Sequence, residues 1–287
     1  MNEHSEQQDA PDLKRSIISK EVLVRLISAL ILGGVTIFLA YFSWGSFLGL
    51  CALMGVWMSV EWGKLTNNDT PLQLAIQIGT ITIAVLAFVL NEPPLFFASL
   101  IGGAFLAAWA GHYWWRSKWA LLGLAYVGGP VLSFLYLRDD PLFGFYAVLF
   151  IFLVVWGSDT AAYFAGRHFG GKKLAPAISP GKTWSGSLGG LFAGLIIGVL
   201  FAISINAEPV ILGFIGLVLS AISQVGDLAE SAIKRHFGVK DSGTLIPGHG
   251  GILDRLDAVV FAVVGAALIA FMRGHESPAQ GLLFWSA

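Results

Sequence analysis

Nine apolar segments, each close to the length that crosses a lipid bilayer, dominate this chain of 287 residues. A spanning α-helix needs roughly 20 apolar residues. Only 12% of the residues are charged, about half the fraction that is usual for a soluble domain. We therefore predict an all-α integral membrane protein with about nine transmembrane helices. The segments are 23–41, 45–60, 72–90, 94–111, 119–137, 143–165, 186–205, 209–230 and 252–272.

Lysine and arginine residues determine the orientation that we predict. If the N-terminus lies in the cytosol and the segments alternate, 15 of the 17 basic residues fall on the cytosolic side, and the other two are Arg138 and Arg273. Basic residues of membrane proteins concentrate in cytosolic loops. We therefore expect the N-terminus and the loop at 167–182 in the cytosol and the C-terminus on the other side. The net charge of −1 gives no reason to expect a nucleic-acid partner.

One segment carries glycine at every fourth position. Small residues at this spacing lie on one helix face and let two helix backbones approach closely. The pattern predicts tight packing inside the chain, and the seam of a homodimer is the alternative. The residues are Gly186, Gly190, Gly194 and Gly198.

Six acidic residues interrupt the apolar segments, and all of them fall at predicted cytosolic ends. A charge at the centre of a bilayer costs about 2.5–3.5 kcal/mol on insertion scales, so such residues need a compensating partner or a function. Their gathering at one face predicts a polar site, formed by the C-terminal helices, for a water-soluble anion and a lipid. The acids are Glu61, Asp159, Asp227, Glu230, Asp254 and Asp257.

Four of these acids recur at helical spacing on the last two segments. Residues three, four and seven positions apart share a helix face. Carboxylates from two helices can converge on Mg²⁺, which prefers oxygen ligands. The alternative is a set of structural ion pairs with Lys234, Arg235 and Arg255. The two faces consist of Asp227, Glu230, Ser231 and Lys234 on one segment and of Asp254 and Asp257 on the other.

The stretch "SPGKTWSG" resembles a phosphate-binding P-loop, but the first glycine of that motif would fall at Pro176, so the assignment fails. Ser179, Lys182 and Thr183 nevertheless precede a predicted helix, whose N-terminus can bind an anion. A solvated loop lysine is the alternative for Lys182. His249, between glycines, can act as a general acid or base, donate to a phosphate, or simply bond within its loop.

From Ser231 to Asp257 the chain reads "SAIKRHFGVKDSGTLIPGHGGILDRLD". This resembles the signature of the phosphatidate cytidylyltransferases, also called CDP-diacylglycerol synthases. The family pattern asks for serine, Lys-Arg, Lys-Asp, a small residue, Pro-x-His-Gly-Gly and Asp-Arg-x-Asp, and every position fits. "WGSDTAAYFAGRHFG" and "SPGKTWSG" resemble two further blocks of the family. The strong resemblance covers about residues 152–260, and "EWGKL" at Glu61–Leu65 is a weaker echo.

The resemblance implies that phosphatidic acid and CTP react, with Mg²⁺, to give CDP-diacylglycerol and pyrophosphate. It implies that Asp227 and Asp254 bind the metal, and it leaves a second cation open. Lys234, Arg255 and His249 then take part in catalysis together with the two aspartates. The remaining expected site residues are Ser179, Lys182, Thr183, Ser231, Arg235, Lys240 and Asp159 for substrate binding, and Glu230, Asp257 and Asp241 as partners of the metal ligands.

We expect three parts along the chain: a disordered cytosolic tail over 1–20, transmembrane helices over 21–141, and catalytic transmembrane helices with cytosolic loops over 142–287. The expected location is the inner (cell) membrane of a bacterium, with the site facing the cytosol. Another membrane lipid nucleotidyl- or phosphotransferase stays open as an alternative. An ion-coupled transporter is a more distant one, because it needs charges near the bilayer midplane.

Overall fold

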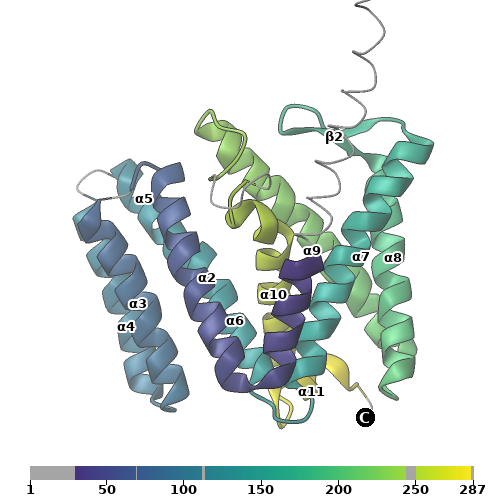
Figure 1. Ribbon diagram of the computed structural model, residues 1–287, viewed down its shortest axis with the longest axis horizontal. Helices are drawn as coiled ribbons and strands as arrows, with labels where there is room; N and C mark the ends of the chain where they lie inside the picture. Colours follow the sequence, from purple (N-terminus) through teal and green to yellow (C-terminus); the bar gives the residue numbers. More distant parts are fainter. Residues whose placement is uncertain (1–29, 69, 112–113, 244–249, 286–287) are drawn as a thin grey trace, which may run out of the picture.

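The computed structural model describes residues 30–68, 70–111, 114–243 and 250–285. Eight helices in these ranges are long and apolar enough to cross a membrane, and they stand side by side in one bundle (Figure 1). A shorter apolar helix, Leu30–Phe42, covers part of the first predicted segment, and the predicted start of that segment at residue 23 lies outside the described residues. The prediction of an all-α membrane protein is confirmed.

The chain builds the bundle in sequence order. The first spans are α2 (Trp44–Leu65), α3 (Pro71–Val89) and α4 (Pro93–Ala110). The next span has three parts, which are α5 (Trp114–Gly123), a π-helical turn η1 (Leu124–Gly128) and α6 (Gly129–Arg138). The C-terminal spans are α7 (Gly144–Phe169), α8 (Trp184–Ser204), α9 (Pro209–His236) and α10 (Leu253–Arg273), followed by the short α11 (Pro278–Leu283). The loop predicted at 167–182 instead holds the end of α7 and an antiparallel hairpin of β1 (Lys173–Ala175) and β2 (Ser179–Thr183).

Local sequence explains where several helices begin. A serine or threonine precedes four of them, and its side-chain oxygen accepts a hydrogen bond from a backbone N–H of the first turn. Proline stands in the first turn of α3, α4, α9 and α11, where a helix has no use for the missing N–H. Capping residues and prolines in the local sequence therefore determine where these helices begin. The capping residues are Ser43, Thr70, Thr183 and Ser277.

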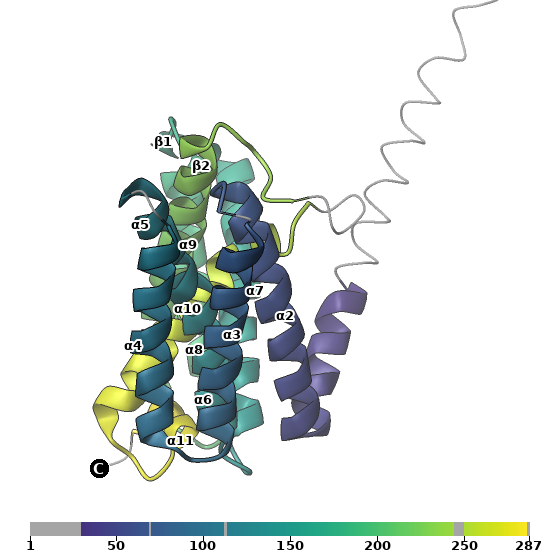
Figure 2. The same ribbon diagram turned by 90° about the vertical axis from the view of Figure 1, so that its left-hand side faces the viewer.

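The two ends of the bundle differ in character. The hairpin, the end of α9 and the start of α10 lie at one end, and α11 lies at the other (Figures 1 and 2). Asp140 fastens the α11 end, because it accepts hydrogen bonds from the backbone of Leu142 and Phe143 at 2.7 Å and from the Ser277 hydroxyl. Burial raises the pKa of Asp140, but these hydrogen bonds outweigh it and hold the pKa below its usual range.

Glycines let α8 pack tightly between α7 and α9. A Cβ atom at Gly198 would lie 2.3 Å from the Leu212 carbonyl oxygen of α9, and one at Gly186 would lie 2.7 Å from the Ala162 carbonyl oxygen of α7. The predicted internal packing is confirmed, and this helix face is not available as a dimer seam. The four glycines of the repeat are all buried: Gly186, Gly190, Gly194 and Gly198.

Gly198→Ala should therefore destabilise the protein by about 1–3 kcal/mol, because the added methyl group meets backbone that cannot turn aside. Thermal unfolding in detergent measures the effect. Gly79→Ala on α3 is the matched control, since a Cβ there meets no atom within 4 Å. Equal melting temperatures for the two variants would contradict the close approach of α8 and α9.

Candidate active site

Two lysines pair with carboxylates at the hairpin end of the C-terminal helices. Lys182 Nζ, on β2, lies 2.5 Å from Asp227 Oδ2 on α9. Lys234 Nζ, on α9, lies 2.6 Å from Asp254 Oδ1 on α10 and 3.3 Å from Glu230 Oε1. The structure thus brings together five predicted site residues from three elements. The structural ion pairs that were the alternative to a metal site are present for Lys234. The pair between Lys182 and Asp227 was not predicted.

Asp254 is held by more than its lysine. Its Oδ2 accepts hydrogen bonds from the backbone N–H groups of Ser242 and Gly251, both at 2.9 Å, and from the Ser242 hydroxyl at 3.0 Å. Asp254 also lies in the first turn of α10, where the helix dipole favours a negative charge. Gly250, with φ of +78°, turns the chain into this arrangement. The negative charge of Asp254 at the start of an apolar helix is therefore stabilised by Lys234, by the hydrogen-bond donors of the preceding loop and by the helix dipole.

Glu230 is almost fully buried, with 1% of its surface exposed. One carboxylate oxygen accepts from Lys234, and the other accepts a 2.5 Å hydrogen bond from the Tyr126 hydroxyl. Tyr126 lies in the π-helical turn η1 and stacks on Trp62 of α2, with ring centroids 4.9 Å apart. Single π-turns inside α-helices are frequent at functional sites. This turn aims a tyrosine from the N-terminal half at the buried carboxylate.

Further acids surround Asp227. Asp159 of α7 interacts electrostatically with Asp227 and Lys182, and Asp257 of α10 interacts with Asp227 and Glu230. Three helices therefore direct carboxylates toward one region, where two lysines supply the opposite charge. Like charges repel, so Lys182 and Lys234 reduce the repulsion among these carboxylates.

The hairpin fixes Lys182 beside α9. Thr183 ends β2 and caps α8, because its hydroxyl oxygen accepts a hydrogen bond from Gly186 N at 3.1 Å. Arg235 Nε of α9 donates to the Ile178 carbonyl oxygen of the hairpin turn at 3.4 Å. Ser179, at the start of β2, is half-buried. Lys182 is thus a strand residue in an ion pair, and the interpretation as a solvated loop lysine is wrong.

The remaining predicted residues lie around these pairs. The Ser231 hydroxyl donates to Asp227 Oδ1 at 3.4 Å. Lys240 and Asp241 are exposed in the chain that follows α9, and Arg255 is exposed in the first turn of α10. His249 lies outside the described residues.

Two residues of the N-terminal half belong to the site although the sequence assigned neither of them a role there. Tyr126 bonds Glu230, as described above. Glu61, at the end of α2, accepts 2.9 Å hydrogen bonds from the backbone N–H groups of Ile252 and Leu253 at the start of α10. The signal for Glu61 was its charge in an apolar segment, whereas nothing distinguished Tyr126 from other aromatic residues of a membrane helix.

The donor groups of the site suit Mg²⁺. This ion is commonly bound by one or two carboxylates together with phosphate oxygens of a substrate. Asp227 and Asp254 offer such carboxylates, each of which is paired with a lysine in the structure. Within the described ranges no three acidic, histidine or cysteine side chains form a cluster that could hold a metal. Phosphate oxygens would therefore have to complete the ligand set.

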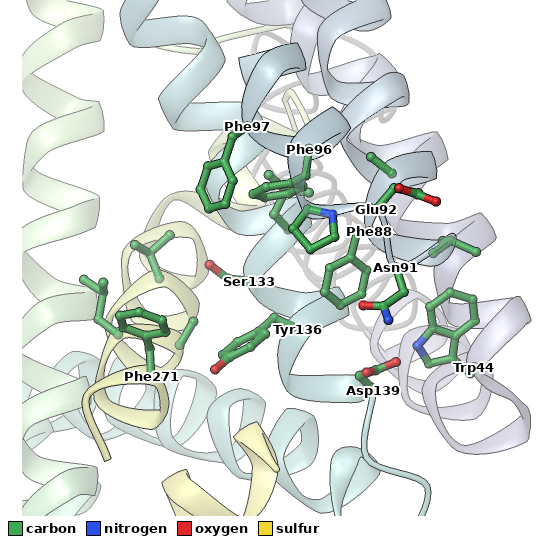
Figure 3. A pocket seen from close by; sticks show the side chains of 17 residues that line it. Trp44, Phe88, Asn91, Glu92, Phe96, Phe97, Ser133, Tyr136, Asp139 and Phe271 are labelled. Carbon is green, nitrogen blue, oxygen red and sulfur yellow. The ribbon is translucent and has the colours of Figure 1, made fainter. Parts of the chain in front are cut away.

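A cavity of about 870 Å³ lies between the α3–α4 hairpin, α6 and α10 (Figure 3). Its wall is mainly aromatic and aliphatic, with Phe88, Phe96 and Phe271 among the lining residues. It also contains the carboxylates of Glu92 and Asp139, and no lysine or arginine is among the described residues that line it. Such a cavity does not suit a phosphate group, and we place the active site at the lysine–aspartate pairs instead.

The chain is similar to known proteins over most of its length. Residues 23–272 match the cytidylyltransferase family. The phosphatidate cytidylyltransferases of Brucella suis and Brucella melitensis are each 41% identical to the chain over 245 residues, which is 83% of this chain and 89% of theirs. The phosphatidate cytidylyltransferase of Staphylococcus saprophyticus is 48% identical over 149 residues, which is 51% of this chain and 56% of its own. The chain belongs to the cytidylyltransferase family, and within it to the phosphatidate cytidylyltransferases.

Proposed function

We propose that this chain transfers the CMP moiety of CTP to phosphatidic acid, giving CDP-diacylglycerol and pyrophosphate for phospholipid biosynthesis. The observation that carries the proposal is the pair of lysine–aspartate contacts, Lys182–Asp227 and Lys234–Asp254, at one end of a membrane bundle. The reaction brings together two anionic substrates, one from water and one from the bilayer, so it needs cationic groups at a membrane surface.

In this reaction a phosphate oxygen of the lipid attacks the α-phosphorus of CTP. A new P–O bond forms between the lipid phosphate and the α-phosphorus. The bond between the α-phosphorus and the oxygen that bridges it to the β-phosphorus breaks, and pyrophosphate leaves with that electron pair. Such transfers depend mainly on positioning and on neutralising charge. Lys182 and Lys234 supply the positive charge, and Arg235 with the exposed Arg255 adds to it at the same end.

The lysines serve two purposes in this proposal. Without substrate each ammonium group neutralises an aspartate that would otherwise be an unpaired charge near the membrane. When phosphates arrive, the ammonium groups can turn to them. Mg²⁺, held by Asp227 and Asp254 together with phosphate oxygens, would neutralise charge on the triphosphate as pyrophosphate leaves. Glu230, which accepts a hydrogen bond from Lys234, would then hold that lysine in place, and Asp257 would add negative charge beside it.

A direct assay tests the proposed function. Purified protein is incubated with phosphatidic acid and labelled CTP, with and without Mg²⁺. We expect label in CDP-diacylglycerol and release of pyrophosphate, both lost when the metal is chelated. Transfer of label to a different lipid acceptor, with none to phosphatidic acid, would favour another lipid nucleotidyltransferase instead.

We also propose that the site faces the cytosol, where CTP is found, in the inner membrane of a bacterium. The distribution of basic residues supports this orientation. Single cysteines replacing Ser5 and Ser286, in a chain whose one native cysteine, Cys51, has been changed to alanine, should react with a membrane-impermeant reagent from opposite sides. The expected result is reaction of the position at 5 from the cytosolic side and of the position at 286 from the other side. The reverse result would refute the cytosolic site, and labelling of both from the same side would refute the nine-helix arrangement.

A further inference from the structure

We propose that Glu61 is a positioning residue, which holds the start of α10 and thereby keeps Asp254 in place. The proposal rests on the function proposed above, because it gives Asp254 a part in that reaction. Glu61 belongs to α2, and 191 positions separate it from the backbone group that it binds at Ile252. It lies outside the strongly resembling stretch of the sequence.

Both oxygens of the Glu61 carboxylate are engaged. Oε1 accepts a 2.9 Å hydrogen bond from Ile252 N. Oε2 accepts one of 2.9 Å from Leu253 N and lies 3.3 Å from the Ser242 hydroxyl. Only 6% of the Glu61 surface is exposed. A buried carboxylate that receives the free N–H groups of a helix start makes strong, charge-assisted bonds, and it is favoured by the helix dipole.

The glycines of the loop before α10 leave room for this carboxylate. A Cβ atom at Gly243 would lie 2.8 Å from Glu61 Oε1, and one at Gly251 would lie 2.2 Å from the Ser242 hydroxyl and 2.5 Å from Glu61 Oε2. Contacts this short do not occur for real side chains, so both positions suit only glycine while Glu61 is in place. Part of the glycine content of the loop is therefore explained by a residue of α2.

Glu61 and Asp254 share one set of donors. Of three successive backbone N–H groups, that of Gly251 goes to Asp254, and those of Ile252 and Leu253 go to Glu61. The Ser242 hydroxyl lies 3.0 Å from Asp254 Oδ2 and 3.3 Å from Glu61 Oε2. A displacement of the helix start away from Glu61 would therefore change the hydrogen bonds of Asp254 as well.

Glu61 stands on a rigid support. The next residue, Trp62, is buried, donates from Nε1 to the Trp119 carbonyl oxygen at 2.9 Å, and stacks on Tyr126. Residues that position a reacting group work only when their own conformation is locked by packing. The end of α2 meets this requirement, so the N-terminal helices contribute to the geometry of the site without contacting the substrates.

The test replaces Glu61 by glutamine. The amide keeps the shape but has one acceptor oxygen, so one of the two N–H groups of α10 faces an NH₂ group. We expect kcat to fall by about tenfold, the size of effect seen for residues that orient metal ligands, and the Mg²⁺ concentration for half-maximal activity to rise. Glu61→Asp, which keeps both oxygens, should recover part of kcat. The matched control is Glu208→Gln, because Glu208 precedes α9 and makes no side-chain cap bond.

Hydrogen exchange of the substrate-free protein provides a readout that needs no activity. Backbone amides at 251–253 should exchange faster in Glu61→Gln than in the wild type, while α8 stays protected. Wild-type exchange at 251–253 together with an unchanged Mg²⁺ requirement would overturn the proposal. If Glu61→Gln does not fold, Glu61→Asp replaces it, because the shorter side chain draws the carboxylate back from the N–H groups of Ile252 and Leu253; unchanged exchange and Mg²⁺ requirement in that variant would count against the proposal equally. An inactive wild type would refute the proposed function alone, because the exchange experiment would still test the hold on α10.

Discussion

Asp254→Asn should lower kcat on the order of a hundredfold or more, because removing one preorganised charge from a phosphoryl-transfer site has effects of that size. The substitution nearly preserves shape, so the protein should still fold and insert. Asparagine has one acceptor oxygen, whereas Asp254 accepts from Lys234 on one oxygen and from Ser242 and Gly251 on the other. The measurement is the transfer of CMP to phosphatidic acid over a series of Mg²⁺ concentrations.

Asp227→Asn should behave similarly, and Asp257→Asn and Glu230→Gln should show smaller losses. Asp139→Asn, an exposed acid after α6, is the control for removing a carboxylate at the far end. Burial, and then the charge of Asp140, raises the pKa of Asp139, so removing its charge carries little cost. Near-normal turnover of Asp254→Asn at unchanged Mg²⁺ demand would mean that Asp254 is only the structural partner of Lys234.

Lys234→Ala should reduce both stability and activity. Lys234 is buried between Glu230 and Asp254, and removal of one member of a buried ionic group leaves the others uncompensated at a cost of about 3–5 kcal/mol. We expect a clearly lower melting temperature in detergent. We also expect a fall in kcat, a rise in the KM for CTP or the lipid, or both, because the ammonium group is one of those proposed to meet a phosphate.

Lys182→Ala separates these two effects. The Lys182–Asp227 pair is about a quarter exposed on each side, whereas Lys234 and Asp254 are each about a tenth exposed, and ion pairs contribute less to stability as their exposure increases. The melting temperature of Lys182→Ala should therefore fall less than that of Lys234→Ala, while its kinetics change as for Lys234→Ala. Unchanged kinetics in both Lys182→Ala and Lys234→Ala would mean that these lysines have only a structural role.

The features that could be predicted from the sequence are those that depend on residues close together in the chain. The apolar segments predicted the transmembrane helices because a helix must be apolar over a minimum length to cross a bilayer. Helical spacing placed Glu230 and Lys234 on one face, and the structure pairs them. The glycine repeat of α8 correctly predicted tight packing because helix backbones approach closely only where the side chains between them are small.

The parts that could not be predicted depend on contacts between distant residues. Glu61 binds backbone groups of Ile252 and Leu253, and backbone N–H groups leave no mark in a sequence. Tyr126, in η1, donates to Glu230 of α9 across 104 positions of the sequence. The strand Ser179–Thr183 contains proline and glycine and lacks the alternating apolar pattern of a strand. The pairing of Lys182 with Asp227 depends on that strand.

The length of α9 has a consequence for how a lipid reaches the site. Its 28 residues extend about 42 Å at 1.5 Å per residue. The uncharged part, residues 209–226, covers about 27 Å, close to the hydrocarbon thickness of a bilayer. With that part in the hydrocarbon region, the remaining turns, which carry Asp227 and Lys234, extend into the headgroup layer. A phospholipid can then bring its phosphate to the level of the site from its ordinary position, with both acyl chains still among their neighbours, and the product can diffuse away sideways without ever entering water.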